Sequence, residues 1–149
     1  VIANGDITTP EKAKHVLDVT GADGIMIGRG TYGRPWFVGH VAHYLKTGEK
    51  KDPPPVELLH SLLKEHLEAM FTHYGEDTGV RIARKHAAWY SKGIHSSAEF
   101  RVKVNQCVSA KEMFDLVDQF YGPHLQSAEE IFDLADQLYA PHLQHEDDA

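Results

Sequence analysis

The sequence predicts two parts of different fold class, an α/β segment followed by an all-α segment, in a chain that is mostly helical overall. The first thirty residues hold two short apolar runs, with one helical pattern between them and a glycine-containing turn after each. Beyond residue 55, apolar residues recur at helical spacing. A strand–helix–strand unit needs a larger parallel sheet with both faces covered, and the rest of the sequence predicts no further strands. We therefore expect the C-terminal part of a longer enzyme.

The α/β segment predicts two helices with clear ends. The first begins at Thr9-Pro10 and ends before Gly21, because threonine caps a helix start and glycine commonly follows a helix end. The second has an apolar face and stops at Thr47-Gly48, and Pro35 is expected in its first turn. That face comprises Trp36, Phe37, Val41 and Leu45.

A linker and four helices are predicted after the α/β segment. Residues 49–55 are polar and include three consecutive prolines, which is typical of a stiff connection between domains. The helices are expected over residues 56–73, over residues 78–92, from Ser96 and from Ser109. Each of the last two begins with a serine followed three residues later by a glutamate, which predicts a capping box. The four helices predict a compact bundle.

Both glycine turns contain residues suited to a phosphate. Glycine lets the backbone approach a ligand closely, so Gly5, Gly28 and Gly30 can point N–H groups into one cavity. Arg29 adds a permanent charge on a planar group. In (β/α)8 barrels the phosphate site commonly follows strands 7 and 8. Together the turns predict a phosphate site at one end of the two strands, although each turn alone also fits an ordinary strand ending.

The net charge of −7 hides one basic segment. Residues 78–108 carry six basic side chains against Glu99 alone, whereas residues 109–149 carry ten acidic ones against Lys111. Nucleic-acid affinity depends on local positive charge rather than on the whole chain. The segment therefore predicts an RNA-binding face, with a solvated surface as the alternative. Trp89 lies in the same segment and fits either a packed anchor or a stacking platform.

The cysteine, the histidines and the apolar runs argue against a disulfide, a metal site and a membrane span. Cys107 is the one cysteine, so a disulfide within the chain is excluded, and we expect it to be a small buried residue. The eleven histidines are scattered, so no metal site is expected. The apolar runs are too short to span a bilayer, and we expect no leader before the first strand. We expect a cytoplasmic protein.

The C-terminal end holds a repeat. Residues 109–126 and 127–144 are identical at 13 of 18 positions, and each copy predicts a capped amphipathic helix. Two copies are too few for a solenoid, so the second is expected to be an extra packing or oligomer helix. An acidic tail follows at residues 145–149, and we treat residues 126–149 as a separate segment.

Four separated segments follow one another in a recognisable order: residues 3–7 (ANGDI), 21–30 (GADGIMIGRG), 33–36 (GRPW) and 84–90 (RKHAAWY). Together they resemble the C-terminal part of the bacterial tRNA-dihydrouridine synthases, most closely the B-type, from residue 1 to about residue 125. The resemblance implies that residues 1–48 end an FMN-binding TIM-type (β/α)8 barrel. It also implies that residues 56–125 form a helical tRNA-binding domain.

The resemblance implies roles for individual residues. FMN, chiefly its phosphate and ribityl end, would be bound by Asn4, Gly5, Asp6, Gly28 and Arg29. The tRNA would be contacted by Arg81, Arg84, Lys85 and Lys92. The intact enzyme would reduce FMN with NADPH and then pass hydride to the C5=C6 bond of a uridine in tRNA, while a cysteine protonates the ring. We expect that cysteine to be absent from this chain and the chain alone to be inactive.

Two other functions stay open at this point. One is a fragment of a different phosphate-binding or FMN-binding barrel oxidoreductase, and the other is a stand-alone RNA-binding helical module. Neither DNA nor a membrane is expected as a partner. Self-association through exposed strands or through the duplicated helix is also considered.

Overall fold

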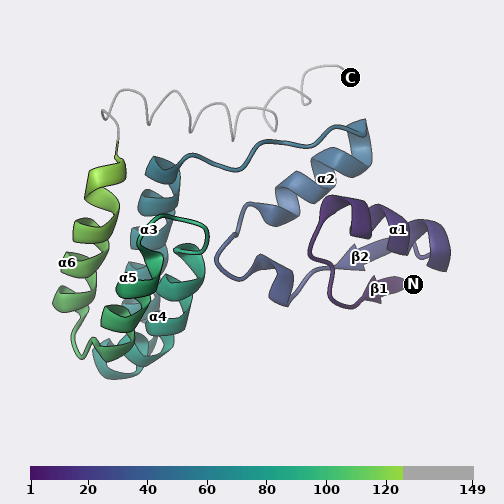
Figure 1. The fold of residues 1–149 in the computed structure, drawn as a ribbon. Helices are drawn as coiled ribbons and strands as arrows, with labels where there is room; N and C mark the ends of the chain where they lie inside the picture. Colours follow the sequence, from purple (N-terminus) through teal and green to yellow (C-terminus); the bar gives the residue numbers. More distant parts are fainter. Residues whose placement is uncertain (126–149) are drawn as a thin grey trace, which may run out of the picture. The chain divides into compact units, whose positions relative to one another are not determined.

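The computed structural model describes residues 1–125, which hold six α-helices and two short strands (Figure 1). The chain divides into two compact units, Val1–Pro53 and Pro54–Ala149. The division falls inside the segment 49–55 that the sequence predicts as a linker. The mostly helical character is confirmed, whereas the assignment of the units to a flavin domain and a tRNA domain stays a prediction.

Two parallel strands joined by a helix begin the first unit (Figure 1). β1 (Ile2–Asn4) lies beside β2 (Gly24–Met26), with Ile2 opposite Gly24 and Asn4 opposite Met26. The connecting helix α1 (Pro10–Thr20) has the predicted ends. The Thr9 hydroxyl oxygen accepts a hydrogen bond from the Lys12 amide at 3.1 Å, and Gly21 closes the helix at φ 64°.

A short 3-10 helix, η1 (Arg29–Thr31), follows β2, and α2 (Phe37–Thr47) comes next. α2 ends as predicted at Gly48, which adopts φ 75°. The expectation for Pro35 is wrong, because α2 begins two residues later. The Phe37 amide donates to the carbonyl of Arg34, and this turn holds Pro35 ahead of the helix.

The core of the first unit joins the loop after β1 to both helices. It is made of side chains that are at most 3% exposed, namely Ile7, Ala13, Phe37 and Val41. Val16, Ile25 and Ile27 pack against this group. The core therefore holds the loop after β1 against α1 and α2, which fixes where the polar residues of that loop lie.

The second unit is a bundle of four helices, as the sequence predicts. They are α3 (Val56–Tyr74), α4 (Glu76–Tyr90), α5 (Ser97–Gln106) and α6 (Ala110–Tyr121), followed by the 3-10 turn η2 (Gly122–His124). Leu63, Leu67, Val104, Met113, Val117 and Tyr121 are fully buried between the helices. α4 begins two residues earlier than predicted, because Gly75 alone makes the turn from α3 at φ 75°.

Of the two predicted capping boxes, one forms its serine cap, and its glutamate reaches the residue before the cap instead of the cap itself. At Ser109 the hydroxyl accepts from the Glu112 amide at 3.1 Å, and the Glu112 carboxylate accepts from the Val108 amide at 2.9 Å. Ser96 instead adopts φ 63° and its side chain makes no cap, so that prediction is wrong. A left-handed residue cannot present its hydroxyl to the first turn as an extended cap does.

The repeat at residues 127–144 and the acidic tail lie outside the described residues. In the part of the chain that the structure describes, no helix is both long and apolar enough to cross a bilayer.

The two serines give a matched pair of variants for the stability of the bundle. Ser109→Ala removes a side-chain cap, which typically costs about 1 kcal/mol of unfolding free energy. Ser96→Ala should change that free energy by less than about 0.5 kcal/mol, as surface substitutions usually do. Urea denaturation followed by circular dichroism measures both. Equal losses in the two variants would contradict the cap assignment.

Candidate functional site

The two glycine turns lie together at one end of the strand pair. Because β1 and β2 are parallel neighbours, their carboxyl ends meet at the same edge. A cavity of about 320 Å³ opens there, lined by Asn4, Gly5, Asp6, Ile7, Gly28, Arg29 and Gly30. The predicted convergence of the turns on one concave spot is confirmed.

Unusual backbone geometry brings the turns into contact. Gly5 adopts φ 144°, and Asp6 adopts φ 36°, a conformation that costs a residue with a side chain about 1–3 kcal/mol. A Cβ atom on Gly30 would lie 2.3 Å from the carbonyl oxygen of Ile7. Only glycine permits that approach, so Gly30 is required by the contact between the turns.

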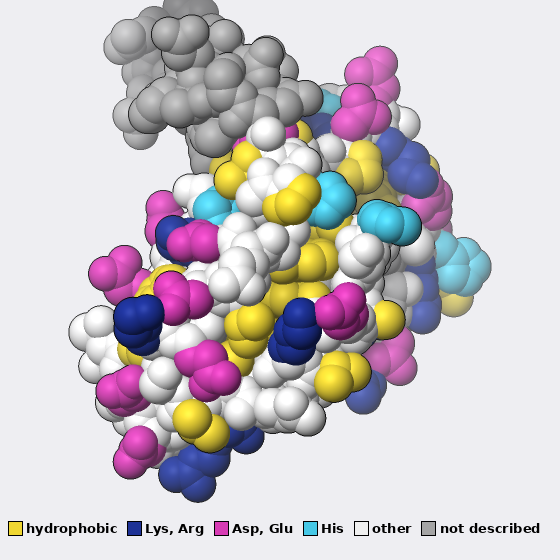
Figure 2. All heavy atoms as spheres, turned by 60° about the vertical axis from the view of Figure 1, so that its left-hand side comes forward, with side chains coloured by type: hydrophobic (Ala, Val, Ile, Leu, Met, Phe, Trp, Pro, Cys, Tyr) yellow, Lys and Arg dark blue, Asp and Glu magenta, His cyan; other side chains and the backbone are white. Residues whose placement is uncertain are grey.

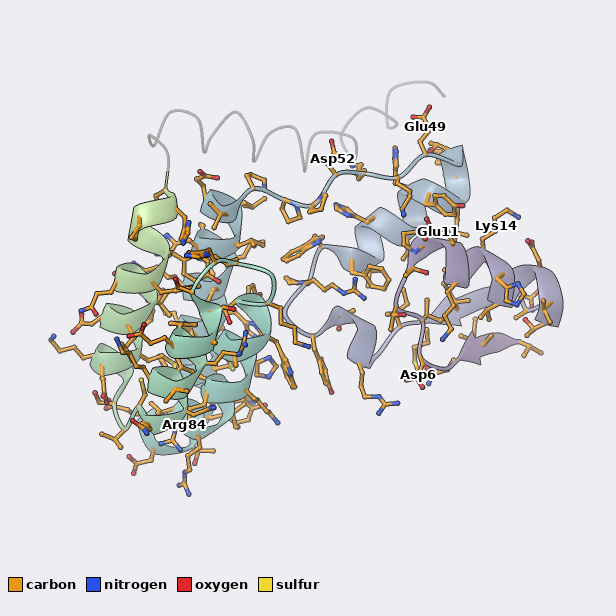
Figure 3. The ribbon with its side chains drawn as sticks, viewed as in Figure 1. Asp6, Glu11, Lys14, Glu49, Asp52 and Arg84 are labelled. Atoms are coloured by element: carbon orange, nitrogen blue, oxygen red, sulfur yellow. The ribbon has the colours of Figure 1, made fainter. Side chains whose placement is uncertain are left out.

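An ion pair joins the turns at the cavity. One terminal nitrogen of Arg29 donates to a carboxylate oxygen of Asp6 at 2.7 Å, and both side chains are largely exposed. Figure 3 shows Asp6 on the turn that leaves β1. The pair leaves the remaining donors of the guanidinium for a ligand, because a guanidinium carries five N–H groups. Asp6 therefore lies where it orients Arg29.

A second arginine ties the same turns together from outside the cavity. Arg34 donates from Nε to the carbonyl of Gly30 and from a terminal nitrogen to the carbonyl of Thr8, both at 2.7 Å. Its guanidinium carbon lies 4.0 Å from the ring centre of Phe37. The sequence assigned Arg34 no role beyond its place in the 33–36 segment, because nothing in its neighbours indicates which carbonyls it reaches.

The basic residues of the second unit are not equivalent. Arg81 and Lys85 are exposed, one helical turn apart on α4, and Lys92 is exposed in the turn after that helix. Within the described residues, no carboxylate forms an ion pair with any of these three. They therefore fit the predicted basic face.

Arg84 has a structural partner. Its Nε donates to the carbonyl of Cys107 at 2.9 Å, and one terminal nitrogen donates to the same oxygen. The side chain is half-buried, and Figure 3 places Arg84 toward the end of the bundle where α5 gives way to α6. Arg84 thus holds that connection, a contact that sequence spacing does not reveal.

Aromatic and histidine side chains cluster near the basic residues of α4. The rings of His86 and Trp89 lie 5.0 Å apart edge to face, and the Lys85 ammonium is 6.0 Å from the Trp89 ring centre. Burial lowers the pKa of His66 and of His86, and the charges of His66 and Lys85 lower that of His86 further. Trp89 is half-buried, so its exposure does not distinguish a packed anchor from a stacking platform for bases.

Charges of both signs mix on the face of the protein that Figure 2 shows. Lysine and arginine lie beside aspartate and glutamate there, without separating into one large basic patch among the described residues. In the bundle, Lys64 pairs with Asp118 at 3.0 Å and Lys103 with Glu99 at 2.8 Å. The basic character of this unit is therefore local to a few positions.

Cys107 is fully buried, as expected, and burial raises the pKa of its thiol to about 11. The thiol is thus protonated at neutral pH. Among residues 1–125, no three His, Cys, Asp or Glu side chains are grouped so that they could hold a metal ion.

Comparisons with known proteins match these features to one family. The family model described as dihydrouridine synthase (Dus) matches residues 1–128. A probable tRNA-dihydrouridine synthase of Rickettsia conorii is 50% identical over 121 residues, which are 81% of this chain and 37% of the relative. The tRNA-dihydrouridine synthase B of Xanthomonas axonopodis is 48% identical over 81% of this chain and 36% of the relative.

A third relative is the tRNA-dihydrouridine synthase B of Shewanella oneidensis, 44% identical over 127 residues, or 85% of this chain and 39% of the relative. The chain thus spans less than two fifths of the length of these relatives. The resemblance that the four sequence segments indicate is confirmed: the chain belongs to the dihydrouridine synthase family.

Proposed function

We propose that this chain is part of a flavin-dependent tRNA-dihydrouridine synthase, which reduces the C5=C6 bond of a uridine in tRNA. The first unit would supply the last βα units of the barrel and the phosphate end of the FMN site, and the second would hold the tRNA. NADPH as the reductant and the cytoplasmic location belong to the same proposal. The names of the relatives and the family match support it.

The observation that carries the flavin assignment is the cavity between the glycine turns. A phosphate needs donors that converge from closely packed backbone together with a fixed positive charge. The cavity offers the backbone of Gly5, Gly28 and Gly30, with Arg29 at its edge. The close approach of Gly30 to the carbonyl of Ile7 leaves no room for a side chain there. These residues fit a phosphate group.

The small sheet supports the placement in a barrel. A two-stranded sheet is marginally stable by itself, and the Ile2 and Met26 side chains are 63% and 55% exposed. Parallel strands are normally covered on both faces, so further strands and helices would bury these side chains.

Each residue of the site has a distinct task in this proposal. Arg29 binds the flavin phosphate, Asp6 holds the Arg29 guanidinium toward the cavity, and Asn4, Gly5 and Gly28 line the wall beside the phosphate and ribityl chain. When bound, the flavin supplies the hydride, while the protein contributes orientation and electrostatics. The target uridine must leave the base stack to reach a flavin, at a cost of a few kcal/mol.

The proposed tRNA contacts are divided by what the arginines and lysines already bind. Arg81, Lys85 and Lys92 are exposed and free of carboxylate partners among the described residues, so they are the proposed phosphate contacts. Arg81 donates only from Nε, to the Asp77 carbonyl of its own helix at 3.2 Å, and keeps its terminal nitrogens for a phosphate. Arg84, which the resemblance also assigns to tRNA, already donates to the Cys107 carbonyl. We propose that Arg84 acts on tRNA binding chiefly by holding α5 and α6 together.

Substituting Arg29 tests the flavin site. Arg29→Ala in the whole protein removes charge-assisted hydrogen bonds worth about 1.5–3 kcal/mol, so the Kd for FMN should rise roughly 10-fold to 100-fold. The Kd for riboflavin, which lacks the phosphate, should stay unchanged. Titration followed by the quenching of flavin fluorescence measures both.

Lys14→Ala is the matched control in the same unit, because Lys14 is exposed and paired with Asp18 on α1, away from the cavity. It should leave both constants unchanged. Equal weakening of FMN and riboflavin by Arg29→Ala would show that Arg29 does not contact the phosphate.

Substituting the exposed cations of α4 tests the tRNA face. Each contact with a phosphate releases counterions, so Lys85→Ala should reduce the slope of log K against log salt concentration by roughly 0.7 to 0.9. Arg81→Ala should do the same. Filter binding of tRNA between 50 and 200 mM salt gives the slope, and FMN content should not change.

Lys111→Ala is the control for charge alone, since Lys111 is exposed on α6 and paired with Asp115. Its slope should equal that of the unsubstituted protein. Arg84→Ala should instead lower the free energy of unfolding by about 1.5–3 kcal/mol, because the Cys107 carbonyl loses the hydrogen bonds from its charged donor. If the slopes for Lys85→Ala, Arg81→Ala, Arg84→Ala and Lys111→Ala all equal that of the unsubstituted protein, the tRNA assignment is wrong.

A further inference from the structure

Arg34 makes three contacts that converge on the two glycine turns. It donates to the carbonyl of Thr8, two residues beyond Asp6, and to the carbonyl of Gly30, which itself lines the cavity. The ring of Phe37, only 3% exposed, lies against its guanidinium and fixes the plane of the fork. Arg34 does not line the cavity, so it acts on the cavity through the turns.

The two glycine turns are in close contact at Gly30 and Ile7, so a side chain at Gly30 would force them apart. Without a side chain at Gly30 the backbone already lies close to the Ile7 carbonyl, and a Cβ there would meet that oxygen at 2.3 Å. The turns are therefore pressed together at Ile7 and Gly30, and Arg34 bridges the neighbouring carbonyls on the same two segments. The Arg29–Asp6 ion pair also joins the two turns, but both of its side chains are largely exposed and it lies at the cavity itself.

We propose that Arg34 is the positioning residue that sets the spacing of the two turns, and that this spacing gives the site its preference for a phosphorylated flavin over an unphosphorylated one. The proposal rests on the proposed function. A phosphate accepts several hydrogen bonds at once, so its binding depends on donors from both turns being at the right separation. The ribityl chain also lies beside these turns in the proposal, but riboflavin has no phosphate that must receive donors from both turns at once.

The fork of Arg34, rather than its charge, performs this task. Nε and a terminal nitrogen reach two carbonyls in one plane, which is a geometry that a lysine ammonium cannot reproduce. Arg34→Lys keeps the charge and loses the fork. It should therefore behave like Arg34→Met, which keeps a similar apolar stem and loses both.

The experiment measures the Kd of FMN and of riboflavin for the whole protein and for three variants, Arg34→Met, Arg34→Lys and Gly30→Ala. Gly30→Ala widens the turns without changing any charge, so it tests the spacing independently. We expect the ratio of the riboflavin Kd to the FMN Kd to fall by about tenfold or more in all three variants, which is a loss of about 1.4 kcal/mol of discrimination. Inorganic phosphate should compete with FMN less well in each variant.

The ratio separates positioning from stability. Both ligands are measured on the same protein, so partial unfolding weakens them equally and leaves their ratio unchanged. A ratio that stays at the unsubstituted value in Arg34→Met and Gly30→Ala overturns the proposal, and so does a normal ratio in Arg34→Lys. If the unsubstituted protein binds neither FMN nor phosphate, the proposed function fails and this inference falls with it. If it prefers FMN and the variants do too, only the role of Arg34 is wrong.

Discussion

Parallel pairing of β1 with β2 is the constraint on which the candidate phosphate site depends. Parallel neighbours end at the same edge of a sheet, so the turns after Asn4 and after Met26 must leave side by side. An antiparallel pair would have sent them to opposite ends. α1 makes this arrangement possible, since it carries the chain back to the starting edge before β2 begins.

Two arginines use the resulting contact in different ways. Arg29 is largely exposed, lines the cavity and pairs with Asp6. Arg34 is half-buried and gives its hydrogen bonds to backbone carbonyls of Thr8 and Gly30. In our proposals, one arginine thus supplies the charge of the candidate site and the other sets the spacing of its turns.

The same division of labour appears in the helical unit. Four of the six basic residues of residues 78–108 already have a partner within the bundle: Arg84 donates to the Cys107 carbonyl, Arg81 to the Asp77 carbonyl and Arg101 to Ser97, and Lys103 pairs with Glu99. Near the start of α6, Glu76 accepts from the Ala110 amide while Ser109 and Glu112 cap the helix. Counting charges along the sequence overstates how many are available to a partner, because the bundle uses Arg84 at the end of α5 and others in contacts one turn apart on the same helix.

The sequence by itself determined the succession of elements and the type of each. Local signals were sufficient where the physical cause is local: Thr9 and Gly21 bound α1, Gly48 ends α2, and apolar spacing produces α3. The pairing of the two glycine turns also followed from the sequence, because a strand–helix–strand unit is parallel. The family was recognisable from four short segments alone.

Only the tertiary structure decided what depends on contacts between distant residues. The two serine motifs read alike in the sequence, yet Ser109 caps its helix and Ser96 does not, because the turn before α5 puts Ser96 at positive φ. Cys107, the partner of Arg84, lies 23 residues away in the chain, and Thr8, one of the two partners of Arg34, lies 26 residues away. The sequence determines how many hydrogen bonds an arginine can donate. Which carbonyls accept them depends on the packing of helices and turns that are distant in the chain.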